Sequence, residues 1–168
     1  GDTFTESGAS YMGFAVSALL ASAIADKPRY TIAFSGDGCF MMNPQILVDG
    51  VEHGVKGCIV IFDNRRMAAI TGLQVAQYGQ GFRTSDAVAV DYVRLAGAVC
   101  GVNALSGGLT AAALRQALEA AHKHDGLSVI HVPVYSGDHE LGGLGAWGQW
   151  NVGNWCEDVQ REWMEQDL

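Results

Sequence analysis

Four short stretches of mostly apolar residues recur along this chain, separated by segments of small and polar residues. The clearest of them is 57–62, where the apolar side chains follow one another directly instead of alternating with polar ones. Continuous runs of this kind are typical of strands in a parallel sheet, because both faces of such a strand are buried. We therefore predict four β-strands, at residues 30–34, 57–62, 102–105 and 127–135.

The segments around these strands carry helical patterns. Four helices are predicted, at 10–25, 43–53, 90–99 and 110–124. Ser10 and Thr110 are suitable caps for the first and last of them, and Gly54 ends the second. The alternation of strands and helices predicts an α/β fold, a three-layer doubly wound parallel sheet with helices on both faces.

Three segments show neither pattern. Residues 36–39 are predicted as a turn and 64–90 as a long loop, and loops of that length in a compact domain are usually functional. The last segment, 137–168, contains all four Trp and many Gly, with a predicted helix at 156–166. We assign 1–136 to the α/β domain and 137–168 to a flap and helix of the same domain. The flap is either plain surface structure or a lid or subunit contact, since Trp is enriched at interfaces.

Composition and charge narrow the possible functions. A chain of 168 residues with 49% hydrophobic residues can form one domain with its own core, and a net charge of −8 argues against nucleic acid or an anionic membrane as partner. Three of the four scattered cysteines lie in apolar patterns, where small core residues are expected, and no C-x-x-C pair suggests zinc or iron–sulfur. These features, with no signal peptide or membrane span evident, predict a cytoplasmic protein. Because the chain begins at Gly1 without Met, it is either processed or one piece of a longer product.

Polar side chains directly follow the first two predicted strands. The first strand runs into S-G-D-G-C, with Asp37 at its centre, and the second runs into D-N, which places Asn64 27 positions further on. In an open parallel sheet, ligands bind at the carboxyl ends of the strands. A carboxylate and an amide oxygen on neighbouring strand ends can share one hard cation such as Mg²⁺, which usually also binds a phosphate group.

Two other interpretations of this stretch are open. Gly-Asp-Gly alone often marks a β-turn, and Asn64 could be unrelated to it. Asp37 could also be the acceptor of a receiver-like or flavodoxin-like domain, although the acidic cluster and the late Lys of a receiver are missing. The two strand contexts and their spacing favour the shared cation.

The stretch resembles the diphosphate-binding motif of thiamine diphosphate enzymes, which is Gly-Asp-Gly, a gap in the twenties and then Asn. The resemblance extends over almost the whole chain and implies that thiamine diphosphate and Mg²⁺ bind here. The implied metal ligands are the side chains of Asp37 and Asn64 and the backbone carbonyl of Arg66. Gly36, Gly38 and Cys39 would lie against the diphosphate, and both glycines are expected at positive φ so that the backbone can approach it.

The same resemblance implies contacts to the two rings of the cofactor. A backbone oxygen near Ser10 would accept a hydrogen bond from the aminopyrimidine, and Met12 would bend the cofactor into its V shape. The alternative for Met12 is plain helix core. Met67 and Ala69, with Ile70 beside them, would line the thiazolium ring.

A Glu on another domain protonates the pyrimidine ring in this family. Glu6 lies on the wrong motif for that role and Glu52 is interpreted as a solvated charge, so no catalytic residue is predicted in this chain. The resemblance therefore implies a partner subunit with a pyrimidine-binding domain and the essential Glu, in a hetero-oligomer of two copies of each chain or larger. The helix at 10–25 is the candidate interface because its small residues allow close packing. Among the histidines, His139 alone is considered near a substrate.

The segment D-N-R-R-M-A-A-I-T-G-L-Q is similar to two branches of the family. One contains indolepyruvate:ferredoxin oxidoreductases, and the other contains sulfopyruvate and phosphonopyruvate decarboxylases and trihydroxycyclohexanedione hydrolases. The tail G-G-L-G-A-W-G-Q-W-N-V-G-N-W is similar to those hydrolases and to acetolactate synthases. Since the oxidoreductases need iron–sulfur clusters, we expect a lyase or transferase, a decarboxylase or carboligase acting on a 2-oxo acid or diketone. An oxidoreductase subunit and a regulatory subunit without chemistry are the alternatives.

Overall fold

The computed structural model describes residues 3–4, 11–25, 27–84 and 88–134. The chain divides into two compact units, the first made of 1–64 and 89–134 and the second of 65–88 and 135–168. The predicted flap at 137–168, with its terminal helix and His139, lies outside the described residues, as do Ser10 and Glu6.

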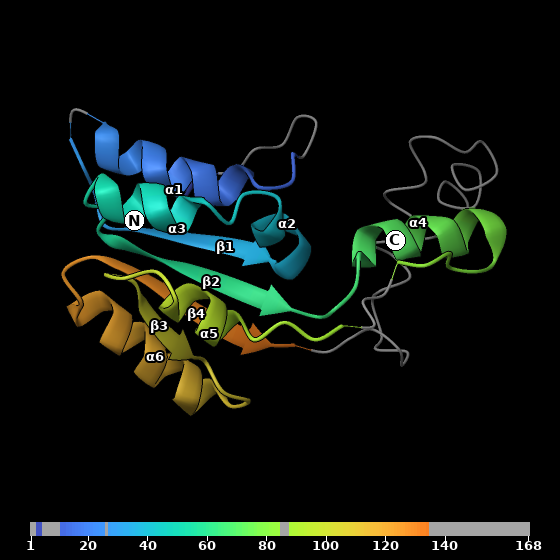
Figure 1. Ribbon diagram of the computed structural model, residues 1–168. Helices are drawn as coiled ribbons and strands as arrows, with labels where there is room; N and C mark the ends of the chain where they lie inside the picture. The colour runs from blue at the N-terminus through green and yellow to red at the C-terminus, as the bar shows by residue number, and fades with distance from the viewer. Residues whose placement is uncertain (1–2, 5–10, 26, 85–87, 135–168) are drawn as a thin grey trace, which may run out of the picture. The chain divides into compact units, whose positions relative to one another are not determined.

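A four-stranded parallel sheet forms the centre of the first unit (Figure 1). Its strands are β1 (Thr31–Gly36), β2 (Gly57–Asp63), β3 (Asn103–Ser106) and β4 (Leu127–Pro133). They are arranged in the order β1-β2-β4-β3, and every neighbouring pair is parallel. All four predicted strands are thus confirmed, each with ends within two residues of the predicted ones.

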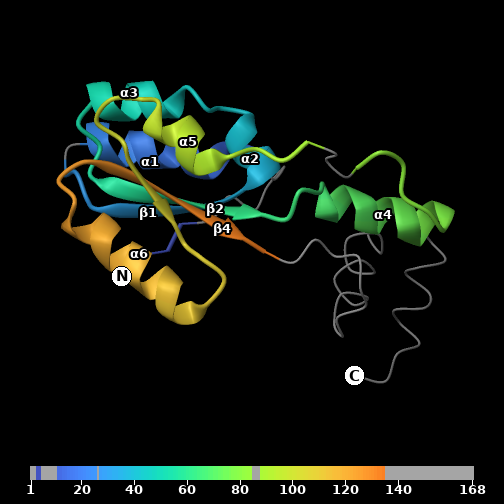
Figure 2. The same ribbon diagram turned by 60° about the horizontal axis from the view of Figure 1, so that its bottom comes forward.

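Helices cover both faces of the sheet, which confirms the doubly wound fold (Figure 2). One face carries α1 (Phe14–Ile24), α2 (Asp37–Met41), α3 (Ile46–Glu52) and α5 (Tyr92–Gly97). The opposite face carries α6 (Ala111–Lys123). The chain moves in opposite directions across the sheet from β1 to β2 and from β3 to β4. Right-handed crossovers therefore place α3 and α6 on opposite faces.

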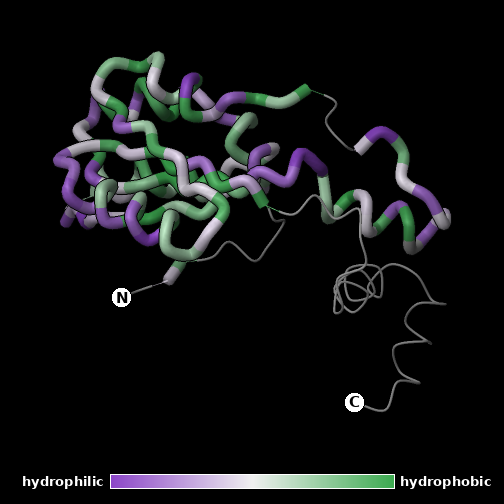
Figure 3. Tube along the Cα trace, turned by 90° about the horizontal axis from the view of Figure 1, so that it is seen from below, coloured by the Kyte–Doolittle hydropathy of each residue, from purple (hydrophilic) through white to green (hydrophobic). Residues whose placement is uncertain are grey.

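Two hydrophobic clusters, one on each face, hold the layers together. Side chains of β2 alternate between them: Ile59 and Ile61 belong to the cluster with α1, α3 and α5, whereas Cys58 and Val60 belong to the cluster with α6. All four are buried. This double burial explains why β2 reads as a continuous apolar run. Figure 3 shows the hydrophobic residues concentrated along the strands.

The first helix is shorter than predicted and begins differently. α1 starts at Phe14 after Gly13, which has a left-handed φ of 88° and provides no side-chain cap, so the expectation that Ser10 caps this helix is wrong. A Cβ at Gly13 would lie 3.4 Å from the Cβ of Met42. Glycine therefore permits both the turn before α1 and its close approach to the segment after α2.

Two segments predicted as non-helical contain helices. The expected turn at 36–39 includes the start of α2, which two glycines concealed because glycine lowers helix propensity. The expected loop at 64–90 contains α4 (Ala68–Tyr78), which belongs to the second unit. Apolar residues of α4 are widely exposed, with Ile70 at 43% and Val75 at 47%, so no one-sided periodicity marks this helix in the sequence.

The remaining helices are confirmed with shifted ends. The hydroxyl oxygen of Thr110 accepts from the Ala113 N–H at 3.1 Å, which is the predicted cap of α6. The helix predicted at 90–99 is α5. α3 begins at Ile46 instead of Asn43, because residues 43–45 form a turn that leads into it.

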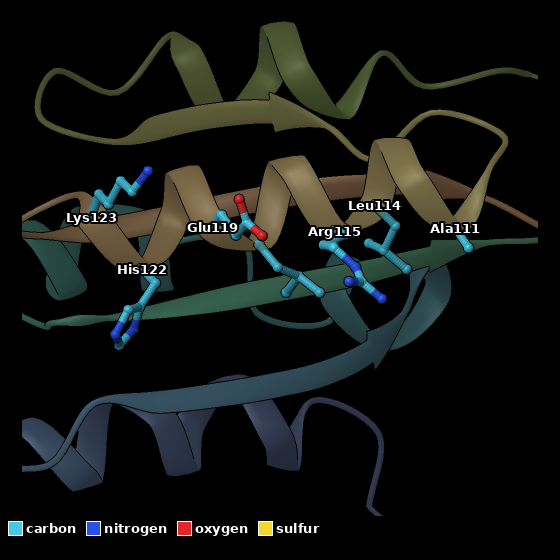
Figure 4. A pocket seen from close by; sticks show the side chains of 7 residues that line it. Ala111, Leu114, Arg115, Glu119, His122 and Lys123 are labelled. Atoms are coloured by element: carbon cyan, nitrogen blue, oxygen red, sulfur yellow. The ribbon is translucent and has the colours of Figure 1, made fainter.

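The edge strand β1 exposes apolar side chains on the face that carries α6. Ile32 is 43% and Phe34 is 62% exposed, and Phe34 stacks on Phe62 with ring centroids 6.0 Å apart. On the same face a shallow groove of about 500 Å³ follows α6, lined by side chains from Ala111 to Lys123 (Figure 4). None of the helices in the described part of the chain has the length and hydropathy needed to cross a bilayer.

Candidate cofactor and metal site

The two predicted side-chain ligands of the cation lie just past the ends of neighbouring strands. Asp37 directly follows β1, and Asn64 directly follows β2. In the register of this pair Gly36 is the partner of Phe62, so both ligands lie within two residues of the last matched positions. Neighbouring strands run about 4.8 Å apart. The structure therefore brings Asp37 and Asn64 to the same edge of the sheet, where ligands bind in open parallel sheets.

Asp37 is a buried carboxylate, 5% exposed, at the first position of α2. The expectation of positive φ at both neighbouring glycines is wrong. Gly36 is extended, with φ at −71°, and Gly38 lies inside α2, which leaves no left-handed position in this turn. Gly36 provides space instead, because a Cβ placed there would have no other atom within 4 Å. The backbone beside Asp37 is thus open to a bulky group.

α2 carries further predicted residues. Gly38 and Cys39 are partly buried, and Phe40, which is fully buried, anchors the helix in the core. The turn that contains Met12 lies alongside, since a Cβ at Gly13 would be 3.7 Å from the carbonyl oxygen of Cys39. Met12 itself is 37% exposed, so it is not the helix-core residue of the alternative interpretation.

Three predicted residues, Arg66, Met67 and Ala69, belong to the second unit. In this unit the Met67 N–H donates to the Thr84 carbonyl at 2.7 Å, and the hydroxyl oxygens of Thr71 and Thr84 lie 2.6 Å apart. Met67 immediately precedes α4 and is partly buried, whereas Ala69 is exposed on its first turn. The backbone around Arg66 and Met67 is therefore held by α4 and by the segment that returns beside it.

A buried contact between two side chains, which sequence reasoning missed, involves the residue that precedes Asn64. The Nε2 atom of His131 on β4 is 2.9 Å from Oδ2 of Asp63, the last residue of β2. Their side chains are 17% and 9% exposed. The ring of Tyr92 lies 5.3 Å from the His131 ring, measured between centroids. No local pattern predicts this pair, because its members are 68 positions apart and meet only through the register of β2 and β4.

The chemistry of the donor set fits a hard cation bound together with an anion. Asp37 offers a carboxylate and Asn64 an amide oxygen. Among the described residues no group of three or more His, Cys, Asp or Glu side chains could hold a metal by itself. Mg²⁺ commonly binds through one or two protein carboxylates plus phosphate oxygens and waters, so it suits such a partial set. A diphosphate that carries Mg²⁺ therefore fits the residues at this edge.

Curated relatives match this chain over different lengths, one over most of it and another over nearly half. A 3D-(3,5/4)-trihydroxycyclohexane-1,2-dione hydrolase from Halalkalibacterium halodurans is 33% identical over 156 residues, which cover 88% of this chain and 24% of the relative. The large subunit of acetolactate synthase isozyme 1 from Escherichia coli is 32% identical over 77 residues, which cover 46% of this chain and 14% of that protein. The chain thus spans about a quarter, 24%, of the length of the hydrolase.

Solved structures share the fold. A thiamine diphosphate-dependent 4-hydroxybenzoylformate decarboxylase from Rhodococcus jostii superposes with a TM-score of 0.67 at 22% identity, over 76% of this chain and 24% of that chain. Benzoylformate decarboxylase from Polynucleobacter necessarius gives a TM-score of 0.67 at 23% identity, over 79% of this chain and 25% of that chain.

The match to a protein family covers both candidate ligands. The family described as "Thiamine pyrophosphate enzyme, C-terminal TPP binding domain" matches residues 1–132, a range that includes Asp37 and Asn64. This range is most of the chain and contains nearly all of the parallel sheet. The chain therefore belongs to the thiamine pyrophosphate enzymes, as a C-terminal cofactor-binding domain of that family.

Proposed function

We propose that this chain is the diphosphate-binding subunit of a thiamine diphosphate- and Mg²⁺-dependent enzyme. The reaction is the non-oxidative cleavage or formation of a carbon–carbon bond in a 2-oxo acid or a diketone, which is a lyase or transferase activity. The observation that carries the proposal is the position of buried Asp37 beside Asn64 at neighbouring strand ends, in a chain of this family.

The residues of this chain bind and orient the cofactor. Asp37 and Asn64, with the backbone carbonyl of Arg66, hold Mg²⁺, while the backbone from Gly36 to Cys39 lies along the diphosphate. The open side of Gly36 supports this role, because a larger residue would occupy the space beside the carboxylate. Ser10, Met12, Met67 and Ala69 contact the two rings.

The substrate class is inferred from the chemistry that the relatives' names have in common. The hydrolase is named for a 1,2-dione, and the decarboxylases are named for benzoylformates, which are 2-oxo acids. Both kinds of molecule have a carbonyl carbon bonded to a second carbonyl or carboxyl carbon. Thiamine diphosphate supplies, when bound, the electron sink that lets such a bond break. We therefore propose that the enzyme breaks or forms this carbon–carbon bond. The relatives' own products are not carried over to this chain.

A partner subunit completes the proposed enzyme. We propose that it carries a pyrimidine-binding domain with the Glu that activates the ring. The chain spans 24% of the length of the hydrolase relative, which leaves room for such a domain elsewhere in the assembly. The α1 helix remains the proposed contact surface, although Val16 and Leu19 on its inner side belong to the domain's own core.

Calorimetric titration of the whole chain with thiamine diphosphate, with and without Mg²⁺, tests the proposal. Asp37→Ala should weaken Mg²⁺-dependent binding by about 30-fold or more, because losing one partner of a buried charge interaction costs about 2–5 kcal/mol. Asn64→Ala should weaken it about tenfold, since only a neutral ligand is lost.

Asp125→Ala is the matched control for this titration. Asp125 lies on the loop before β4, at the opposite end of the strands, where its side chain is 82% exposed beside Lys56. This variant should bind as the unmodified chain does. Unchanged affinity in Asp37→Ala, with a normal circular dichroism spectrum, would remove the metal assignment and the proposed function with it.

A further inference from the structure

We propose that His131 is a positioning residue for the metal site. Through its hydrogen bond with Asp63 it holds the end of β2, and thereby the side chain of Asn64, where the cation would bind. The inference rests on the proposed function, because it gives a role to residues of β2 and β4 that adjoin the candidate metal site. His131 is not itself a ligand in this scheme. It acts through Asp63 and the peptide bond that joins Asp63 to Asn64.

The two members of the pair lie on neighbouring strands and on the same face of the sheet. In the register of β2 and β4, His131 is the partner of Ile61, and Asp63 is the partner of Pro133. The ring of His131 therefore reaches diagonally toward the end of β2, where Nε2 lies 2.9 Å from Oδ2. Because an ionised carboxylate can only accept, Nε2–H is the donor of this hydrogen bond.

Burial makes the geometry of this pair well defined. The side chains of His131 and Asp63 are only 17% and 9% exposed. A hydrogen bond from a nearby donor stabilises a buried carboxylate, so the bond from His131 favours the rotamer of Asp63 that makes it. The backbone is held as well, because the Val134 N–H donates to the Asp63 carbonyl at 2.9 Å. These two hydrogen bonds therefore fix the direction in which the backbone continues from Asp63 to Asn64.

Aromatic packing links this pair to the strand end that carries Asp37. Tyr92, which is 3% exposed, lies 5.3 Å from the His131 ring and 5.9 Å from the Phe40 ring, the latter at an interplanar angle of 79°. Phe40 is fully buried on α2, the helix that begins at Asp37. The row Asp63–His131–Tyr92–Phe40 thus connects the two strand ends whose side chains would share the cation.

Two substitutions at position 131 separate positioning from plain structural support. His131→Leu fills the space but removes the donor to Asp63. His131→Gln has an amide N–H that can reach the same carboxylate. It should therefore restore the position of Asn64 and the affinity for Mg²⁺. Ile130→Ala is the matched control, because Ile130 is a fully buried neighbour on β4 that belongs to the cluster on the opposite face. Ile130→Ala should lower the free energy of unfolding but leave the Asn64 side chain and the affinity for Mg²⁺ unchanged.

Two measurements on the full chain follow the effect. In the ¹⁵N-labelled protein without ligand, the side-chain amide resonance of Asn64 is identified by its loss in Asn64→Ala. We expect this resonance to shift or broaden in His131→Leu and to return toward its original position in His131→Gln. In calorimetry with thiamine diphosphate present, the dissociation constant for Mg²⁺ should rise about tenfold in His131→Leu, as is usual when a group that orients a ligand is lost. His131→Gln should bind Mg²⁺ nearly as the unmodified chain does, because it keeps a donor to the same carboxylate.

The inference is overturned if His131→Leu binds Mg²⁺ normally with an unchanged Asn64 resonance. It is also overturned if His131→Gln is as impaired as His131→Leu, or if Ile130→Ala produces the same changes. Should His131→Leu fail to fold, Asp63→Leu decides in its place, because it removes the acceptor of the same hydrogen bond. Normal Mg²⁺ affinity with an unchanged Asn64 resonance in that variant would also overturn the inference. Normal affinity in Asp37→Ala is a separate result: it contradicts the proposed function, whereas normal affinity in His131→Leu alone contradicts only the positioning role.

Discussion

Individual cysteines on this chain differ in chemistry because they differ in position. Cys58 lies on β2, fully buried, and burial raises the pKa of its thiol to about 12. Cys39 is partly buried on α2, and Cys100 is exposed after α5. The sequence pattern predicted core positions for three of the four cysteines. Among those in the described residues only Cys58 fits that expectation fully, since Cys100 follows its helix and is not packed beneath it.

Alkylation with iodoacetamide at pH 8 should therefore separate these thiols. The reactive form is the thiolate, and a thiol with a pKa near 12 provides about one part in ten thousand of it at this pH. We expect Cys100 to be modified first and Cys58 only after unfolding in guanidinium chloride. Peptide mapping by mass spectrometry shows the order in which the cysteines are modified. Modification of Cys58 in the native protein at a rate similar to Cys100 would contradict the burial of β2.

At the residue scale, sequence could predict that the two candidate ligands lie at strand ends, but not that His131 and Asp63 are in contact. Asp37 and Asn64 each follow an apolar run directly, so the pattern of a strand end and a polar residue is local and readable. His131 and Asp63 are 68 positions apart, and their contact depends on which strands are neighbours and in what register. Nothing near either residue in the sequence contains that information.

At the element scale, the strands were easier to predict than the short helices. Burial on both faces gives a strand a run of apolar residues that needs no periodicity to be recognised. α2 has only five residues and contains Gly38, and α4 contains Gly72 and exposes apolar side chains on several sides. Packing and local hydrogen bonds, such as that between Met67 N–H and the Thr84 carbonyl, stabilise elements whose own sequence preference is weak.

Replacing glycine with alanine should have opposite effects on stability at two positions. Gly57 begins β2, and a Cβ there would collide with the Thr31 carbonyl oxygen and lie 2.8 Å from Cδ1 of Leu19. Gly57→Ala should lower the free energy of unfolding by about 1–3 kcal/mol, as overpacking usually does. Gly72 lies inside α4 with no other atom within 4 Å of such a Cβ. Gly72→Ala should not destabilise, and it should favour helix by about 0.5–1 kcal/mol.

Thermal unfolding followed by circular dichroism compares the two variants. A melting temperature for Gly57→Ala equal to that of the unmodified chain would show that β1, β2 and α1 can separate more easily than the structure implies. A large decrease for Gly72→Ala would mean that this face of α4 is covered in solution.

At the scale of the whole molecule, the sequence predicted the class of the fold but not the order of its strands. Continuous apolar runs alternating with helices point to a parallel sheet, and right-handed crossovers limit the topologies. The place of β4 between β2 and β3 depends on contacts that the patterns do not encode. The apolar surface of β1 around Ile32 and Phe34 was also not foreseen, because a run of apolar residues does not show which face of a strand is covered.

We expect the chain alone to be inactive even when saturated with thiamine diphosphate and Mg²⁺. The proposed partner supplies the Glu that acts on the pyrimidine ring, and no carboxylate in this chain is assigned that role. Exchange of the thiazolium C2 proton, followed by NMR, should therefore proceed at nearly the rate of the free cofactor. A sample without protein provides the reference. Acceleration by several orders of magnitude would place the acid in this chain, and Glu6 would be the first residue to replace.

The strand order has a consequence for synthesis on the ribosome. The segment from β1 to Asn64 is contiguous and is synthesised before β3 and β4, so both strand ends of the candidate site are made before the other two strands. β3 emerges next but has β4 as its neighbour in the sheet and must wait for it. When β4 inserts between them, it joins β3 to β2 and at the same moment brings His131 to Asp63. The contact that we propose positions the candidate metal site therefore forms only after β4 has joined the sheet.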